Sequence, residues 1–166
     1  MKILGIDPGY DKCGFSVIEG EVGKEKLLYS TCVKTSPKDS FSKRLFEVAT
    51  KEKELIQQFS PTHLAIESLF FTNNQKTAMR VAEVRGVLMY LAQERGLSVY
   101  EFNPLQVKTS ILGSGRADKK QMEFMVKKII KIDKKIEEDD EFDAIAIALT
   151  FSANSRSLDL NKQKAI

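Results

Sequence analysis

The stretch of residues 3–9, ILGIDPG, constrains the fold more than any other part of the sequence. Its apolar residues predict a short buried strand, and the Pro8-Gly9 pair after them predicts a turn. Asp7 therefore lies where the strand leaves its sheet, so a rigid element holds its carboxylate. An aspartate before a Pro-Gly pair is also a common turn former, and a purely capping role for Asp7 stays open.

A second strand is predicted directly after this turn. Gly9 and Gly14 have the spacing that opens a phosphate-binding P-loop, but Phe15 stands where that motif requires lysine, which excludes a P-loop. Residues 15–18 instead predict a strand that pairs with the first and leaves Gly14 at a bulge or a close approach.

Composition predicts one soluble domain without a thiol-based metal site. A chain of 166 residues that is 42% hydrophobic can bury one core of ordinary size. No run approaches the ~18 apolar residues of a membrane span, and the N-terminus lacks a signal peptide's apolar core, so we expect a cytoplasmic protein. Cys13, Cys32 and His63 are too few for a disulfide framework or a zinc site. Any catalytic metal would be held mainly by oxygen, which favours Mg²⁺ or Mn²⁺.

Basic residues are concentrated in one segment. The whole chain has 26 basic and 23 acidic residues, a net charge of +3, but residues 104–135 carry nine basic against three acidic residues, or +6. A local basic field beside acidic residues is typical of a protein that binds a polyanion through metal ions, and a solvated lysine-rich face is the alternative. The basic residues of the segment are Lys108, Arg116, Lys119, Lys120, Lys127, Lys128, Lys131, Lys134 and Lys135.

The remaining pattern predicts an α/β protein with a mixed five-stranded sheet flanked by helices. The strand at 63–66 runs into Glu67, which repeats the pattern at Asp7. Residues 1–153 form the predicted domain, and residues 154–166 form a polar tail that we expect to be disordered. Together with the strand at 63–66, the apolar periodicity predicts strands at 27–33 and 99–102. It also predicts helices at 41–59, 73–95, 122–130 and 140–153 and a short helix from 104.

Four acidic residues are candidates for a metal site. Asp140 and Asp143 lie three residues apart at the start of the last predicted helix, so their side chains share one face near the positive end of the helix dipole. Acids also favour a first helical turn without binding anything. Together with Asp7 and Glu67, however, they could supply the carboxylates that two metal ions about 3.5 to 4 Å apart require for phosphodiester hydrolysis.

Five short motifs give the chain a resemblance to a known family. The order of elements resembles the ribonuclease H fold, and the motifs resemble the RuvC family of Holliday junction resolvases up to Phe151. Each motif is moderately specific alone, but their order and spacing together are highly specific. The matching stretches are Gly5-Ile6-Asp7-Pro8-Gly9, Ala65-Ile66-Glu67, Val84-Arg85-Gly86, Pro104-Leu105-Gln106-Val107-Lys108 and Asp140-Glu141-Phe142-Asp143-Ala144-Ile145-Ala146-Ile147-Ala148.

This resemblance implies a structure-specific endonuclease that resolves four-way (Holliday) DNA junctions by paired symmetric nicks during recombination and DNA repair. It also implies a homodimer, two Mg²⁺ ions or Mn²⁺ in their place at each active site, and the branch-migration proteins RuvA and RuvB as partners. Lys108 and Lys119 match the family's basic residues, whose charge could hold or neutralise the phosphate that is cut. The metal ligands implied by motif are Asp7, Glu67, Asp140 and Asp143.

DNA contacts and a subunit interface are implied as well. In a loop, Phe70 could stack on an unpaired base, an interaction worth ~1 to 3 kcal/mol, whereas the alternative is that Phe70 and Phe71 are both core residues. Met79, Val84 and Met89 form a second apolar face on helix 73–95, which is either a subunit interface or buried. The expected DNA-binding residues are Phe70, Asn74, Lys76, Arg80, Lys108, Arg116, Lys119 and Lys120.

Two other enzyme classes and a binding function are the alternatives. Actin-like sugar kinases and chaperone ATPases share the opening strand, aspartate and glycine turn, but they need two such domains and 166 residues hold one. A ribonuclease H-like family that processes ribosomal RNA precursors shares the opening motif, but the segment 104–120 and the Asp140/Asp143 pair favour the resolvase. A junction-binding module without catalysis would gain little from four acids that face phosphates.

Overall fold

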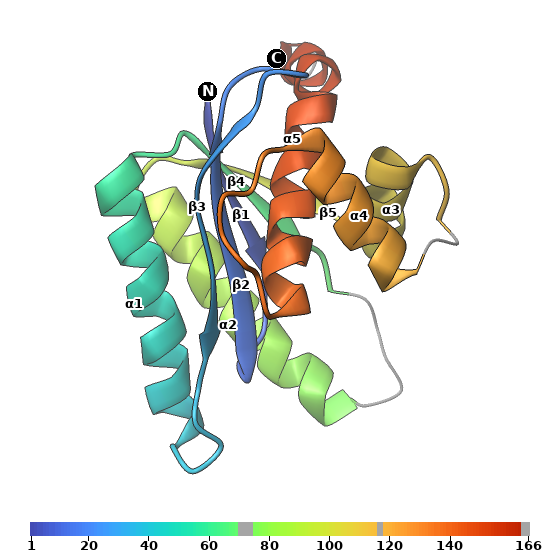
Figure 1. Cartoon of the computed structure of the whole chain (residues 1–166). Helices are drawn as coiled ribbons and strands as arrows, with labels where there is room; N and C mark the ends of the chain where they lie inside the picture. The colour runs from blue at the N-terminus through green and yellow to red at the C-terminus, as the bar shows by residue number, and fades with distance from the viewer. Residues whose placement is uncertain (70–74, 116–117, 164–166) are drawn as a thin grey trace.

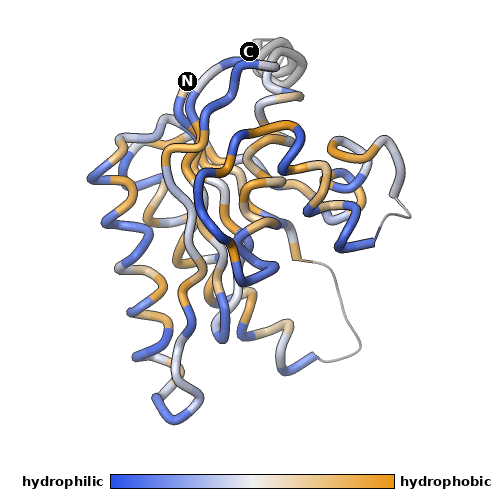
Figure 2. Tube along the Cα trace, viewed as in Figure 1, coloured by the Kyte–Doolittle hydropathy of each residue, from blue (hydrophilic) through white to orange (hydrophobic). Residues whose placement is uncertain are grey.

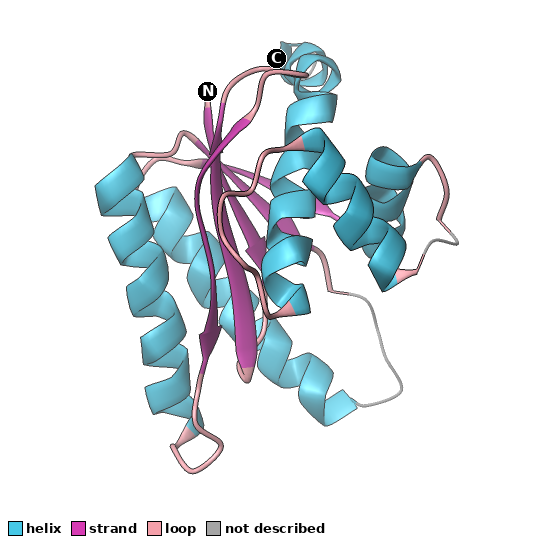
Figure 3. Ribbon diagram, in the orientation of Figure 1, coloured by secondary structure: helices cyan, strands magenta, loops and turns pink. Residues whose placement is uncertain are grey.

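A five-stranded sheet with helices against both faces forms the framework (Figure 1, Figure 3). The structure is a computed structural model that describes residues 1–69, 75–115 and 118–163, with side chains up to Ser155. The sheet order is β3-β2-β1-β4-β5, with β1 (Lys2–Asp7), β2 (Lys12–Glu19), β3 (Lys26–Lys34), β4 (His63–Glu67) and β5 (Ser98–Phe102). The helices are α1 (Phe41–Phe59), α2 (Gln75–Glu94), α3 (Pro104–Leu112), α4 (Lys119–Ile129) and α5 (Asp139–Gln163).

The strands that carry Asp7 and Glu67 are parallel neighbours. Ile6 of β1 is in register with Ile66 of β4, so Asp7 and Glu67 leave the sheet at the same end. Strands β1, β2 and β3 form an antiparallel meander, in which β2 pairs with β1 as predicted, and β5 adds to β4 in parallel. The predicted mixed five-stranded sheet is therefore confirmed.

Hydrophobic residues run through the central strands (Figure 2) and form one cluster on each side of the sheet. Leu4 and Ile6 belong to the cluster under α1 and α2, whereas Ile3 belongs to the cluster under α5. Because successive side chains of a strand point to opposite faces, Asp7 points to the face that α5 covers. Within the described part of the chain, no helix combines the length and apolar character needed to cross a membrane.

Two glycines of the sheet allow α5 to approach closely. A Cβ on Gly5 would lie 2.4 Å from the carbonyl oxygen of Ala144, and one on Gly14 would lie 1.8 Å from that of Asp140. The buried Ser16 hydroxyl donates a hydrogen bond of 2.8 Å to the Ala144 carbonyl, which ties β2 to the same helix. These contacts bring the first turn of α5 against the ends of β1 and β2.

Two predicted helix boundaries differ from the structure by three residues or more. Helix α4 begins at Lys119 rather than at residue 122, because Asp118 and Gln121 form a reciprocal capping box. Helix α5 continues to Gln163, whereas we expected it to end at residue 153 before a disordered tail. Residues 154–163 contain no glycine or proline, and Asn154 Nδ2 donates to the Thr150 carbonyl at 2.8 Å, so its polar side chain bonds within the helix.

Candidate active site

Asp7 and Glu67 meet at the end of the sheet. Both line an open pocket of about 350 Å³, between the ends of β1 and β4 and the start of α2. Burial raises the pKa of Glu67 to about 7, and repulsion from Asp143 adds to the shift, against the opposing charges of Arg85 and Lys108. The other lining residues are Pro8, Ser68, Leu69, Thr77, Ala78, Val81, Arg85 and Pro104.

Helix α5 adds two more carboxylates to this end of the sheet. Burial raises the pKa of Asp7 well above its usual range, and repulsion from Glu67, Asp143 and Asp140 raises it further. Burial likewise raises the pKa of Asp143 to about 6, with Lys119 opposing the shift and Asp140 adding to it. The four acids named from the sequence therefore influence one another, as groups of one site do.

The donors of this site suit a hard divalent cation, although the side chains are not gathered into a finished metal site. Within the described ranges, no group of three or more His, Cys, Asp and Glu residues is placed to hold a metal ion. The available donors are carboxylate oxygens, which Mg²⁺ and Mn²⁺ prefer. Burial first, and then mutual repulsion, raises the pKa values of Asp7, Glu67 and Asp143, and a bound cation would favour the ionised form of each carboxylate.

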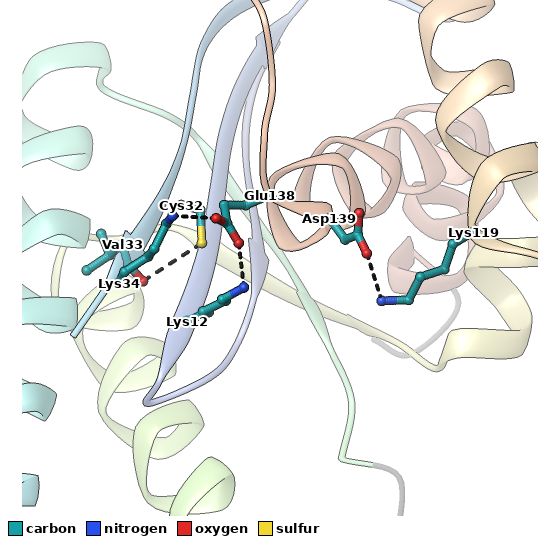
Figure 4. A network of polar contacts seen from close by, with 7 residues as sticks. All are labelled: Lys12, Cys32, Val33, Lys34, Lys119, Glu138 and Asp139. Carbon is teal, nitrogen blue, oxygen red and sulfur yellow. Dashed lines mark hydrogen bonds and ion pairs between the residues drawn. The ribbon is translucent and has the colours of Figure 1, made fainter. Parts of the chain in front are cut away.

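Both lysines named from the sequence lie beside these acids. Lys119, the first residue of α4, places Nζ 3.2 Å from Asp139 Oδ2 (Figure 4), and its charge lowers the pKa values of Asp7 and Asp143. Lys108 lies on α3, which begins at Pro104 after the capping residue Asn103, and it lowers the pKa values of Glu67 and Asp143. Two different helices therefore bring positive charge to the carboxylates.

Arg85 is a site residue to which sequence reasoning gave no role. Its Nε donates to the Glu67 backbone carbonyl at 2.8 Å, and its guanidinium forms an ion pair with Glu101. The Arg85 side chain is only 11% exposed, so it joins α2 to the ends of β4 and β5. The signal was present in the family motif Val84-Arg85-Gly86, which contains this arginine.

Of the remaining expected DNA contacts, the three that the structure describes are not gathered around the carboxylates. Lys76 is exposed in the first turn of α2, and Lys120 lines a separate pocket beside α4. Arg80 pairs with Glu83 at 2.8 Å and lies 4.1 Å above the Phe41 ring, on the side of α2 that faces α1. Three further residues, Phe70, Asn74 and Arg116, lie outside the described residues.

Comparison with known proteins identifies the family. Residues 3–151 match the family model of the crossover junction endodeoxyribonuclease RuvC. The chain belongs to the RuvC family. RuvC of Natranaerobius thermophilus is 41% identical over 152 residues, which cover 92% of this chain and 94% of that protein. RuvC of Thermosipho melanesiensis is 42% identical over 156 residues, which cover 94% of this chain and 99% of that protein.

A solved RuvC structure shares the fold. Thermus thermophilus RuvC in complex with a Holliday junction substrate matches this chain with a TM-score of 0.88, at 32% identity over 95% of this chain and 96% of that one. The chain therefore has the ribonuclease H-like fold of RuvC, which its motifs predicted.

Proposed function

We propose that this chain is a crossover junction endodeoxyribonuclease, a metal-dependent hydrolase that resolves Holliday junctions by paired symmetric nicks during recombination and DNA repair. The observation that carries the proposal is the group of Asp7, Glu67, Asp140 and Asp143 at one end of a RuvC-family sheet. Acids in this arrangement would repel a DNA phosphate unless cations lay between them. Metal ions bound by these acids would remove the repulsion, which is why the arrangement suits a metal-dependent nuclease.

Asp7, Glu67, Asp140 and Asp143 would hold two Mg²⁺ ions, or Mn²⁺ in their place. Two such ions, when bound, supply Lewis-acid stabilisation of the attacking and leaving oxygens of a phosphodiester. The oxygen-only donor set and the raised pKa values of Asp7, Glu67 and Asp143 support this assignment. The carboxylates must lose their protons before they can bind, because the ionised form is the ligand.

Lys108 and Lys119 would hold the phosphate that is cut beside these carboxylates. The Lys119 side chain is 77% exposed and its partner Asp139 is 65% exposed, so a phosphate oxygen can replace Asp139 as the acceptor. Arg85 cannot move in this way, because its guanidinium is buried between Glu67 and Glu101. We assign Arg85 to holding the end of β4, and therefore Glu67, in place.

The wider DNA surface would extend from the site over α2, α3 and α4. Phe70 would stack on an unpaired base of the junction, as the family motif implies. Because Arg80 lies on the α1 side of α2, its contact would be with a duplex arm rather than with the phosphate that is cut. The remaining proposed contacts, which neutralise backbone phosphates or bond to them, are those of Asn74, Lys76, Arg116 and Lys120.

A homodimer would pair two such sites on one junction, and α2 carries a face that suits it. Met79 and Tyr90 are exposed by 68% and 64%, whereas Val84 is buried in the core. Gly86 is exposed in the middle of the helix, and a Cβ there would meet nothing within 4 Å. A helix-weakening glycine with free space around it is consistent with a partner that packs closely against it.

The Gly86→Ala substitution tests this dimer. The added methyl should stabilise the helix of the isolated chain by about 0.5 to 1 kcal/mol, yet weaken self-association if the partner packs there. Sedimentation equilibrium beside thermal unfolding separates the two effects, and unchanged self-association would place the interface elsewhere. As further partners we propose RuvA and RuvB, and since the substrate is cellular DNA, we place the enzyme in the cytoplasm.

Strand cleavage tests the proposed function directly. A synthetic four-way junction, a linear duplex and a structured RNA are incubated with the chain in Mg²⁺ and in EDTA. We expect symmetric nicks that are confined to the junction and abolished by EDTA. Cleavage of the RNA alone would instead support the RNA-processing nuclease, and junction binding without any cut would leave a recognition protein.

A further inference from the structure

Glu138 occupies the last position before α5 and connects this helix to the β2–β3 hairpin (Figure 4). Its Oε2 accepts a hydrogen bond of 2.5 Å from Lys12 Nζ at the start of β2, and its carboxylate also forms an ion pair with Lys34 at the end of β3. Its backbone carbonyl accepts from the Glu141 amide at 3.2 Å. One residue thus joins two strands to the first turn of the helix.

The neighbouring Glu137 has the same charge as Glu138 but different contacts. Its side chain is 69% exposed and pairs with Lys135 at 3.1 Å, two positions away in the same connection. The Glu138 side chain is 18% exposed, and its partners lie more than 100 residues away in the sequence. The contacts of Glu138 therefore constrain tertiary structure, whereas those of Glu137 are local.

The first turn of α5 needs such a constraint because its acids repel those of the sheet. Gly14, the register partner of Asp7, lies so close to α5 that a Cβ there would be 1.8 Å from the Asp140 carbonyl oxygen, so Asp140 and Asp143 are brought to the end of β1, where ionised carboxylates repel one another. The first turn of a helix also opens most readily, since its amide groups lack intrahelical partners. Lys134 opposes this motion as well, with Nζ 2.5 Å from Glu141 Oε1 and 2.6 Å from the Ser30 carbonyl.

We propose that Glu138 is a positioning residue of the active site, which acts through Lys12 and Lys34 to hold Asp140 and Asp143 against Asp7. This inference rests on the proposed function, because it concerns how that site binds its divalent cations. Glu138 itself touches neither substrate nor metal in this proposal. Its ion pairs keep the repelling carboxylates close before a cation neutralises them, so their loss lowers the affinity for the cation.

The Glu138→Gln substitution tests the proposal, with Glu137→Gln as the matched control. We expect the half-saturating Mg²⁺ concentration for junction cleavage to rise roughly tenfold in Glu138→Gln, as for residues that orient metal ligands. The maximal rate at saturating Mg²⁺ should stay within about twofold of wild type, because the reacting groups are intact. Glu137→Gln should change neither quantity.

A double-mutant cycle tests whether Glu138 acts through the two lysines. Lys12→Met with Lys34→Met should raise the half-saturating Mg²⁺ concentration as Glu138→Gln does, and the triple variant should show no further rise. Direct Mn²⁺ binding, followed by loss of the free-ion electron paramagnetic resonance signal, gives a readout that needs no cleavage. Thermal unfolding of each variant identifies any that fail to fold.

Three results would overturn the inference. Equal Mg²⁺ and Mn²⁺ titrations for Glu138→Gln and Glu137→Gln would remove the positioning role. Additive effects in the cycle would show that Glu138 does not act through Lys12 and Lys34. Weaker junction binding after loss of the lysines, with unchanged Mn²⁺ affinity, would make them DNA contacts instead. If wild type bound Mn²⁺ tightly but cut no junction, the proposed function would fail while the Mn²⁺ titrations still decided the inference.

Discussion

Glu52 is buried without a partner, and we expect it to make stability fall as the pH rises. It lies on the core side of α1 with no exposed surface, and neither of its carboxylate oxygens has a hydrogen-bond partner among the described residues. Burial raises its pKa from 4.5 to about 9. The folded protein therefore holds a proton on Glu52 at neutral pH that the unfolded chain releases.

The sign and size of this effect follow from linkage. Because the pKa of Glu52 is higher in the folded protein than in the unfolded chain, the free energy of unfolding is highest below about pH 4.5, where both states are protonated. It falls progressively as the pH rises towards about pH 9, because the unfolded chain loses its proton first. At 1.36 kcal/mol for each unit, the loss between about pH 5 and pH 8 is about 4 kcal/mol. Glu52→Gln removes this titration while keeping the shape of the side chain.

Urea unfolding of wild type and Glu52→Gln across this pH range measures the effect. We expect the free energy of unfolding of the variant to increase by about 4 kcal/mol relative to that of wild type as the pH rises from about 5 to about 8. Glu54→Gln is the control, because the Glu54 side chain is 55% exposed on the same helix. Parallel stability curves for wild type and Glu52→Gln would refute the reasoning and show that Glu52 is ionised or solvated.

Two further predictions concern the active site. The rate of cleavage at limiting Mg²⁺ should rise between about pH 5 and pH 8. The reason is that Asp143 and Glu67, with pKa values of about 6 and about 7, bind metal only when ionised. A cleavage rate that does not change with pH would contradict this. Gly14→Ala should lower the free energy of unfolding, measured in urea, by about 3 kcal/mol and should slow cleavage, because its Cβ would lie 1.8 Å from the Asp140 carbonyl oxygen. Unchanged stability would show that α5 can shift freely.

The carboxylate pair of the sheet could be predicted because its cause is local. An apolar run followed by an acid and a turn places that acid at a strand end, and this holds for Asp7 and Glu67 alike. Parallel pairing of β1 and β4 then brings the two strand ends together. The placement of Asp140 and Asp143 on one face of a helix could be predicted as well, because helical spacing alone sets it.

The features that sequence reasoning missed depend on how distant elements pack together, which no local sequence pattern encodes. Glu138 and Lys12 are 126 positions apart and meet only because Gly5 and Gly14 let α5 lie close on the sheet. Glu52 falls within the apolar periodicity of α1, where sequence reasoning predicts core residues and gives no reason for an acid. The end of α5 was missed because polar side chains that usually stop a helix bond within this one.

Asp7→Asn tests the central claim, that the carboxylates at the end of the sheet hold the cations that cut the junction. Cleavage of a four-way junction in Mg²⁺ is measured beside junction affinity and thermal unfolding without metal. We expect cleavage to be abolished, junction affinity to stay largely intact, and metal-free stability to rise, because one repelling acid is gone. Equal loss of cleavage and binding, with lower stability, would make Asp7 a structural residue and contradict the account.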